Sequence, residues 1–171
     1  IGAMERYIVD EAVKLGWRPD LSRVRPTPWS VGGVGAGPAG LSAADVLSRN
    51  GISVTVYDRY PEIGGLLSFG IPDFKLEKWV IDRRIKVMEE EGVVFRCHAN
   101  VGVNVSINDV LREFNAIVLA GGSTVPRNLN VPGRELKGVY FAMDFLKQNN
   151  KRVAGKDFLA NVTQRWETEA D

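Results

Sequence analysis

The sequence predicts an α/β domain built on a parallel central sheet. Three observations within residues 31–58 carry this prediction. The glycines Gly35, Gly37 and Gly40 form a G-x-G-x-x-G pattern directly after a candidate strand. A helical repeat of small and apolar residues follows, and then a strand rich in β-branched residues that ends at Asp58. Strand, glycine turn, helix and strand in this order are typical of a Rossmann-like, dinucleotide-binding fold.

Each glycine of the pattern has a separate task. Gly35 allows a tight turn, Gly37 lets the backbone approach a pyrophosphate, and Gly40 lets the helix lie close to the strand. The helix N-terminus offers free N–H groups and the positive end of its dipole. Asp58 follows the first glycine by about 20 residues, where an acid that holds a ribose hydroxyl belongs. The alternative is a glycine-rich turn that binds nothing. The glycine pattern, the helix, the strand and Asp58 all occur at the spacing that a nucleotide site needs, and this favours the nucleotide site.

Composition narrows the class of protein. At 171 residues with 44% hydrophobic residues, the chain fits one domain or a domain with an arm. A net charge of +1 gives no field for capturing nucleic acid or an anionic membrane, so neither is expected as a partner. No apolar run approaches the roughly 20 residues of a membrane span. No signal peptide precedes the first predicted helix, and we therefore expect a reducing, cytoplasmic setting.

The N-terminal part, residues 1–28, is predicted to be a helix and a linker. Apolar residues at helical spacing within residues 4–15 give the helix one apolar face, namely Met4, Ile8, Ala12 and Leu15. We expect this face to make the helix a docking arm. Prolines and arginines then interrupt any regular pattern up to residue 30.

The middle of the chain, residues 29–148, is predicted to be the nucleotide-binding domain. After Asp58, the pair Gly64-Gly65 lets a loop run close to a flat or charged group, and an irregular loop follows at residues 68–78. A helix is predicted over residues 76–91 and a strand over residues 93–98. We expect Cys97 to be a small buried residue and His98 to lie on the surface.

The last predicted elements are a helix over residues 107–114, capped by Ser106 or Asn108, and a strand over residues 116–120. The strand is continuously apolar, which predicts a central strand buried on both faces. Residues 121–123 then place glycine at its carboxyl edge, where open α/β sheets bind ligands. A further helix is predicted at residues 141–146, and residues 149–171 are a divergent tail.

Several stretches carry a family resemblance, namely residues 34–41, 54–59, 63–67, 70–78, 81–85, 118–122, 126–127 and 131–138. The most specific is Gly-Ile-Pro-Asp-Phe-Lys-Leu-Glu-Lys at residues 70–78. Together they resemble the small (β) subunit of glutamate synthase, one of the FAD- and NADPH-dependent oxidoreductases of the pyridine nucleotide-disulfide type. The resemblance implies a Rossmann-like FAD-binding domain, of which this chain is the first half.

The resemblance also implies which residues bind the cofactor. FAD, not NADPH, would lie on the first glycine motif, with the acid at Asp58 in place of the family's usual glutamate. The implied cofactor-binding residues are Gly35, Ala36, Gly37, Pro38, Ala39, Gly40, Asp58, Arg59, Gly64, Gly65, Leu66, Gly70, Ile71, Val101, Ala120 and Gly121. No side chain is predicted to be catalytic, because the flavin performs the chemistry.

Three departures from the family pattern limit what this chain does alone. Cys97 is the only cysteine, which excludes disulfides and any cysteine-only zinc or [4Fe–4S] site within the chain. There is no second G-x-G-x-x-G for NADPH after Gly40. Gly32 and Gly33 also weaken a strand that is normally β-branched. NADPH and iron–sulfur binding are therefore expected of the whole family enzyme and not of this chain, which we do not expect to oxidise NADPH alone.

Three functions stay open at this point. The first is the FAD-binding portion of a glutamate synthase small subunit, which passes electrons from NADPH through FAD towards the large subunit, where glutamate forms from glutamine and 2-oxoglutarate. The second is a non-catalytic nucleotide-binding or docking module. The third is a related NADPH:ferredoxin-type reductase, and fold analogy cannot separate these three functions.

Overall fold

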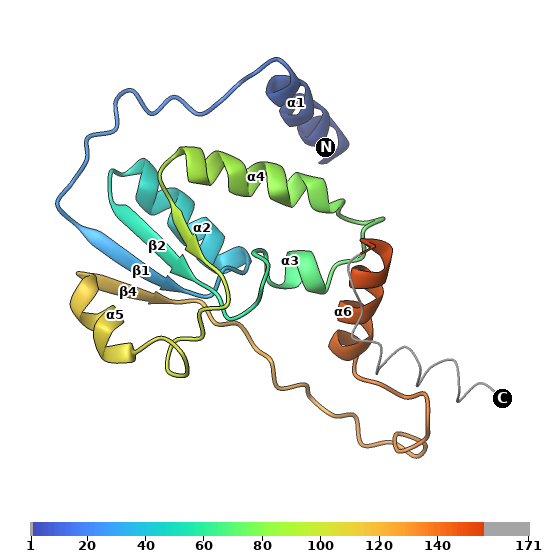
Figure 1. The fold of residues 1–171 in the computed structure, drawn as a ribbon. Coiled ribbons are helices and arrows are strands. Elements are labelled where there is room, and N and C mark those ends of the chain that lie inside the picture. Colours follow the sequence, from blue (N-terminus) through green and yellow to red (C-terminus); the bar gives the residue numbers. More distant parts are fainter. Residues whose placement is uncertain (1, 156–171) are drawn as a thin grey trace.

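A parallel sheet between two helical layers forms the body of the protein (Figure 1). The computed structural model describes residues 2–155. Its strands are β1 (Ser30–Val34), β2 (Ser53–Tyr57), β3 (Val94–Arg96) and β4 (Ala116–Leu119), in the order β3-β2-β1-β4. All three neighbouring pairs are parallel. The predicted α/β class with a parallel sheet is therefore confirmed.

Helices α2 (Pro38–Arg49) and α4 (Lys78–Glu90) cover one face of the sheet. Alternation along β2 directs Val54 and Val56 to this face, where they join the first core cluster. Met88 of α4 is among its most buried side chains. The whole cluster is Ala36, Leu41, Ala44, Val54, Val56, Met88 and Val93. Because Ala36 belongs to it, the core reaches the glycine turn itself.

Helix α5 (Ile107–Glu113) covers the opposite face, where Tyr57 and Val110 are buried. The Ser106 side chain caps this helix by accepting from the Asp109 N–H at 3.3 Å, which confirms Ser106 as the cap. Packing on this face also explains Gly32, a residue that is unfavourable in a strand such as β1. A Cβ built on Gly32 would lie 2.7 Å from a ring carbon of Phe114, so the glycine leaves room for this aromatic side chain.

The prediction of a buried central strand at residues 116–120 is wrong for the described part of the chain. There, β4 lies at the edge of the sheet and pairs with β1 alone. Leu119 is 82% exposed. A continuous apolar run reports that both faces of a strand suit burial. It does not report whether another element covers those faces.

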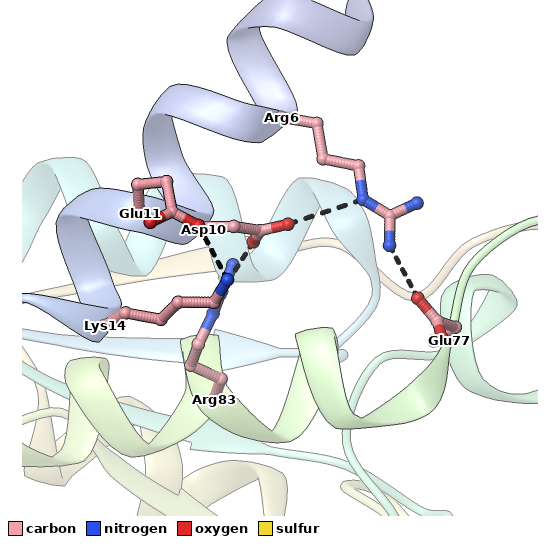
Figure 2. Close-up of polar contacts among 6 residues, drawn as sticks. All are labelled: Arg6, Asp10, Glu11, Lys14, Glu77 and Arg83. Carbon is pink, nitrogen blue, oxygen red and sulfur yellow. Dashed lines mark hydrogen bonds and ion pairs between the residues drawn. The ribbon is translucent and has the colours of Figure 1, made fainter.

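Helix α1 (Gly2–Lys14) lies beside α4 (Figure 1), but not through the predicted apolar face. Met4 and Ile8 are 69% and 63% exposed. The contact is polar instead, as Figure 2 shows: Arg6 pairs with Glu77 at 2.6 Å, and Asp10 pairs with Arg83 at 2.8 Å. The apolar spacing correctly predicted a helix and incorrectly predicted its docking face, because charged side chains on α4 and before it meet this side of α1.

Two helices lie away from the sheet. Helix α3 (Leu66–Phe69) follows the Gly64-Gly65 pair, and α6 (Ala142–Val153) packs against it after a long extended connection (Figure 1). The predicted domain boundary after residue 148 thus falls inside α6. The rest of the predicted tail, residues 156–171, lies outside the described residues. None of the described helices is long and apolar enough to cross a membrane.

Candidate nucleotide-binding site

The turn after β1 is built so tightly that two of its positions exclude any side chain. Gly35 has φ of +107°, and its N–H donates to the Tyr57 carbonyl at 2.8 Å. A Cβ on Gly35 would overlap the Ala120 carbonyl, and one on Gly40 would overlap the Gly35 carbonyl. Both predicted roles, the tight turn and the close helix, are therefore realised. The Ala120 carbonyl is brought against the turn at the same time.

Gly37 differs from its two neighbours in the motif. It is the N-cap of α2 with φ of −76°, which any residue can adopt. A Cβ built on Gly37 would meet no atom within 4 Å. The backbone at Gly37 therefore borders open space, as an approaching phosphate requires. The first helical N–H donor of α2 is that of Leu41, which donates to the Gly37 carbonyl at 2.9 Å. The N–H groups of Ala39 and Gly40 precede it and can serve a ligand, while Pro38 has no N–H to satisfy.

The Gly64-Gly65 pair packs against the glycine turn that follows β1. The Gly64 N–H donates to the Ala36 carbonyl at 2.9 Å, and a Cβ on Gly65 would lie 2.9 Å from the Gly37 Cα. Both residues have positive φ, +114° and +53°. The sequence indicated that this pair runs close to something flat or charged. In the structure, Gly65 lies against the backbone of the glycine turn, whereas a Cβ on Gly64 would meet the Ser68 side chain.

Asp58 ties the end of β2 to the same turn. The residue is only 7% exposed; its carboxylate Oδ2 accepts from the Ala36 N–H at 2.6 Å, and Oδ1 accepts from the Tyr60 N–H at 2.9 Å. Each carboxylate oxygen has two lone pairs, so acceptor capacity remains on both. Burial raises the pKa of the neighbouring Cys97 thiol, and the charge of Asp58 raises it further. Cys97 is only half-buried, less than the sequence indicated.

The predicted site residues fall into two groups. The first group meets at the carboxyl ends of β1, β2 and β4: Gly35, Ala36, Gly37, Pro38, Ala39, Gly40, Asp58, Gly64, Gly65, Ala120 and Gly121. Leu66 begins α3 directly after them. The second group is more distant. Gly70 and Ile71 lie at the other end of α3, Val101 packs against the second core, and the Arg59 guanidinium lies over the Tyr60 ring.

Sequence reasoning missed two polar residues beside this site. The Lys78 ammonium donates to the carbonyls of Leu67, Ile71 and Leu76, and Asn150 of α6 donates to the Ile71 carbonyl. Burial lowers the pKa of Lys78, and the charge of Asp73 opposes this effect. In the sequence, Lys78 ends a loop and Asn150 lies in a polar helix. Neither position indicates that both residues donate to the Ile71 carbonyl. Within residues 2–155, no cluster of histidine, cysteine or acidic side chains is suited to a metal ion.

Comparison with known proteins relates this chain to families of oxidoreductases. A family model described as an NAD(P)-binding Rossmann-like domain matches residues 34–91. The glutamate synthase [NADPH] small chain of Escherichia coli K12 is 46% identical over 155 residues, which cover 91% of this chain and 33% of that protein. This chain is a homologue of the glutamate synthase small chain. It spans about a third of the length of the small chains that it matches.

Two other comparisons broaden the relationship beyond the glutamate synthase small chain. AegA of Escherichia coli K12, named as an oxidoreductase, is 47% identical over 159 residues, which cover 93% of this chain and 24% of AegA. Among solved structures, FprA of Mycobacterium tuberculosis in complex with NADPH superposes with a TM-score of 0.63 at 26% identity. The match covers 74% of this chain and 29% of FprA. Homology therefore extends from glutamate synthase small chains to other oxidoreductases.

Proposed function

We propose that this chain is the FAD-binding portion of a glutamate synthase (NADPH) small subunit. In the whole enzyme it would carry electrons from NADPH through FAD towards a large subunit, where glutamate forms from glutamine and 2-oxoglutarate. The observation that carries the proposal is the open space beside the Gly37 backbone. The rest of the turn is packed so tightly that Gly35 and Gly40 admit no side chain. The homology to glutamate synthase small chains supports the choice of enzyme.

The residues present fit the diphosphate of a dinucleotide. Gly37 leaves room for it, and the first N–H groups of α2 together with the positive end of the helix dipole favour its charge. Asp58 lies next to the turn with acceptor capacity left for a ribose hydroxyl. Bound FAD would supply the capacity to accept a hydride. The protein's own part is to hold the diphosphate and a ribose of the nucleotide and thereby to orient it.

The proposal is tested by titrating the purified 171-residue chain with FAD and with NADP⁺ while following flavin fluorescence and binding heat. We expect FAD to bind more tightly, because the Asp58 carboxylate repels a 2′-phosphate. Tighter binding of NADP⁺ would instead make this the pyridine-nucleotide site, as the description of the matching family model suggests. Absence of binding by either ligand would contradict the nucleotide site itself.

A related reductase with another electron acceptor is the second candidate, because AegA is as similar to this chain as the small chains are. An assay of NADPH oxidation distinguishes the activity of this chain alone from that of a longer enzyme. Hydride transfer needs the nicotinamide within about 3–3.5 Å of the flavin, and this sequence contains one dinucleotide motif. We therefore expect no anaerobic NADPH oxidation above free FAD when an artificial acceptor is added. Turnover above that level would show productive binding of both cofactors.

A further inference from the structure

The Lys78 side chain is engaged in an unusual way for a lysine. Its Nζ donates to three backbone carbonyls, those of Leu67 at 3.0 Å, Ile71 at 2.5 Å and Leu76 at 3.1 Å. An ammonium group has three N–H donors, and all three are used here. The carboxylate of Asp73 accepts from the Lys78 backbone N–H at 3.2 Å. The Lys78 ammonium thus donates to backbone carbonyls and does not form an ion pair with the Asp73 carboxylate.

These carbonyls belong to the loop that joins α3 to α4. Helix α3 has four residues, and the last carbonyls of any helix lack a helical partner. The Leu67 and Ile71 carbonyls lie in and just after α3, where the dipole is negative and a cation is favoured. Ammonium-to-carbonyl bonds are charge-assisted and therefore stronger than neutral ones. Lys78 thereby compensates for the poor intrinsic stability of a single helical turn.

A second donor comes from a remote element. Asn150 on α6 donates its Nδ2 to the Ile71 carbonyl at 3.1 Å, and Asn150 is 7% exposed. The Ile71 carbonyl therefore receives one hydrogen bond from the start of α4 and another from α6. Tyr60 adds an aromatic contact to the same short helix, because its ring lies 5.2 Å from that of Phe69.

The other end of α3 lies at the glycine turn. Gly65 immediately precedes the helix, and a Cβ there would lie 2.9 Å from the Gly37 Cα. The Ser68 hydroxyl, inside the helix, donates to the Ile63 carbonyl at 2.6 Å. A single turn of helix therefore connects the border of the nucleotide site to the carbonyls that Lys78 holds.

We propose that Lys78 is the positioning residue for residues 66–76, which follow the Gly64-Gly65 pair at the proposed nucleotide site. Its ammonium fixes the segment around Ile71 and, through α3, the Gly64-Gly65 pair at the border of the nucleotide site, and Asn150 supports it at the shared carbonyl. The proposal rests on the proposed function for the identity of the ligand. Its structural part, the ordering of residues 66–76 by Lys78, is independent of which nucleotide binds.

The test compares Lys78→Met with Lys86→Met, which makes the same change at an exposed position of the same helix. Amide hydrogen exchange without ligand should be faster within residues 66–76 in Lys78→Met and unchanged in Lys86→Met. FAD affinity should fall about tenfold or more in Lys78→Met, as the loss of a charge-assisted hydrogen bond implies. The visible circular dichroism of FAD bound at saturation should change as well, which a loss of global stability alone would not produce.

Asn150→Ala provides a second variant if Lys78→Met folds poorly. We expect a smaller loss of FAD affinity in the same direction, and a double variant that loses less than the sum of the single losses, because both donors share one carbonyl. Equal exchange within residues 66–76 in Lys78→Met and Lys86→Met would overturn the positioning role. Wild-type FAD binding with unchanged affinity in Lys78→Met and Asn150→Ala would overturn it also. If the wild type binds no FAD, the proposed function fails, and the exchange result still decides what Lys78 does.

Discussion

The glycine turn and helix α1 are attached to the same domain by opposite means. At the turn, backbone meets backbone so closely that Gly35 and Gly40 admit no Cβ. At α1, side chains meet through two ion pairs (Figure 2): an exposed one between Arg6 and Glu77 and a partly buried one between Asp10 and Arg83. Two glycines thus fix one region by excluded volume, and two pairs of charges hold the other.

These two means of attachment predict different responses to substitution and to changes of salt or pH. Excluded volume does not depend on salt or pH, whereas exposed ion pairs are screened by salt and contribute about 0–1 kcal/mol each. The turn should therefore be intolerant of substitution and insensitive to solvent conditions. The attachment of α1 should tolerate substitution and respond to solvent conditions.

The largest effect is expected from Gly40→Ala. The added Cβ would overlap the Gly35 carbonyl, and backbone atoms cannot move aside as a flexible side chain can. We expect a loss of roughly 3 kcal/mol or more in the free energy of unfolding, at the upper end of overpacking effects. Urea denaturation measures it, with Gly37→Ala as the matched control. The control should lose less than about 1 kcal/mol, because its Cβ meets nothing. Equal midpoints for the two variants would refute the packing argument.

A smaller effect is expected from Asp10→Asn, which removes the charge that pairs with Arg83. We expect faster proteolysis within α1 at low salt and little change in the free energy of unfolding. In the wild type, molar salt should reproduce the same proteolysis pattern. Glu5→Gln is the control, since it neutralises another acid of α1 outside these pairs. If Glu5→Gln loosened the helix as much as Asp10→Asn, the specific pairing would not be what holds it.

The smallest effect concerns pH. Hydrogen bonding to Arg83, followed by its charge and by Arg6, holds the pKa of Asp10 below its usual range. Below the ordinary aspartate value of about 3.9, the unfolded chain therefore binds more protons at this site than the folded one. The contribution of Asp10 is complete above that value and is lost as pH falls through its lowered pKa. Proteolysis of α1 should rise over this acid window in the wild type. In Asp10→Asn that pH dependence should be smaller, since only the Arg6–Glu77 pair remains.

The same contrast explains how much of the molecule could be predicted from its sequence. The order of β1, the glycine turn, α2 and β2 was predictable because its determinants are local: the glycine spacing, the helical repeat and the β-branched strand. The ends of α4 and the cap at Ser106 followed from similarly local signals. These elements also bring most of the predicted site residues together at one edge of the sheet.

The features that escaped prediction depend on residues far apart in the chain. Among the described residues, β4 lies at the edge because it pairs with β1 alone, and Leu119 is left exposed. The face by which α1 docks depends on charges near α4. Lys78 and Asn150 share the Ile71 carbonyl only after the chain has folded. The reason for Gly32 became visible only when Phe114 was found against it. Sequence periodicity reports a residue's own preference and not its partner.

The central claim is that a nucleotide diphosphate lies against the open backbone of Gly37. Gly37→Val tests it most directly, because its side chain would enter open space and should leave the fold intact. Gly2→Val is the matched control, at an open helical position away from the turn. FAD titration with melting curves for both variants gives the result. We predict that Gly37→Val keeps most of its thermal stability and loses FAD binding, while Gly2→Val keeps both. Wild-type FAD affinity in Gly37→Val would contradict the site.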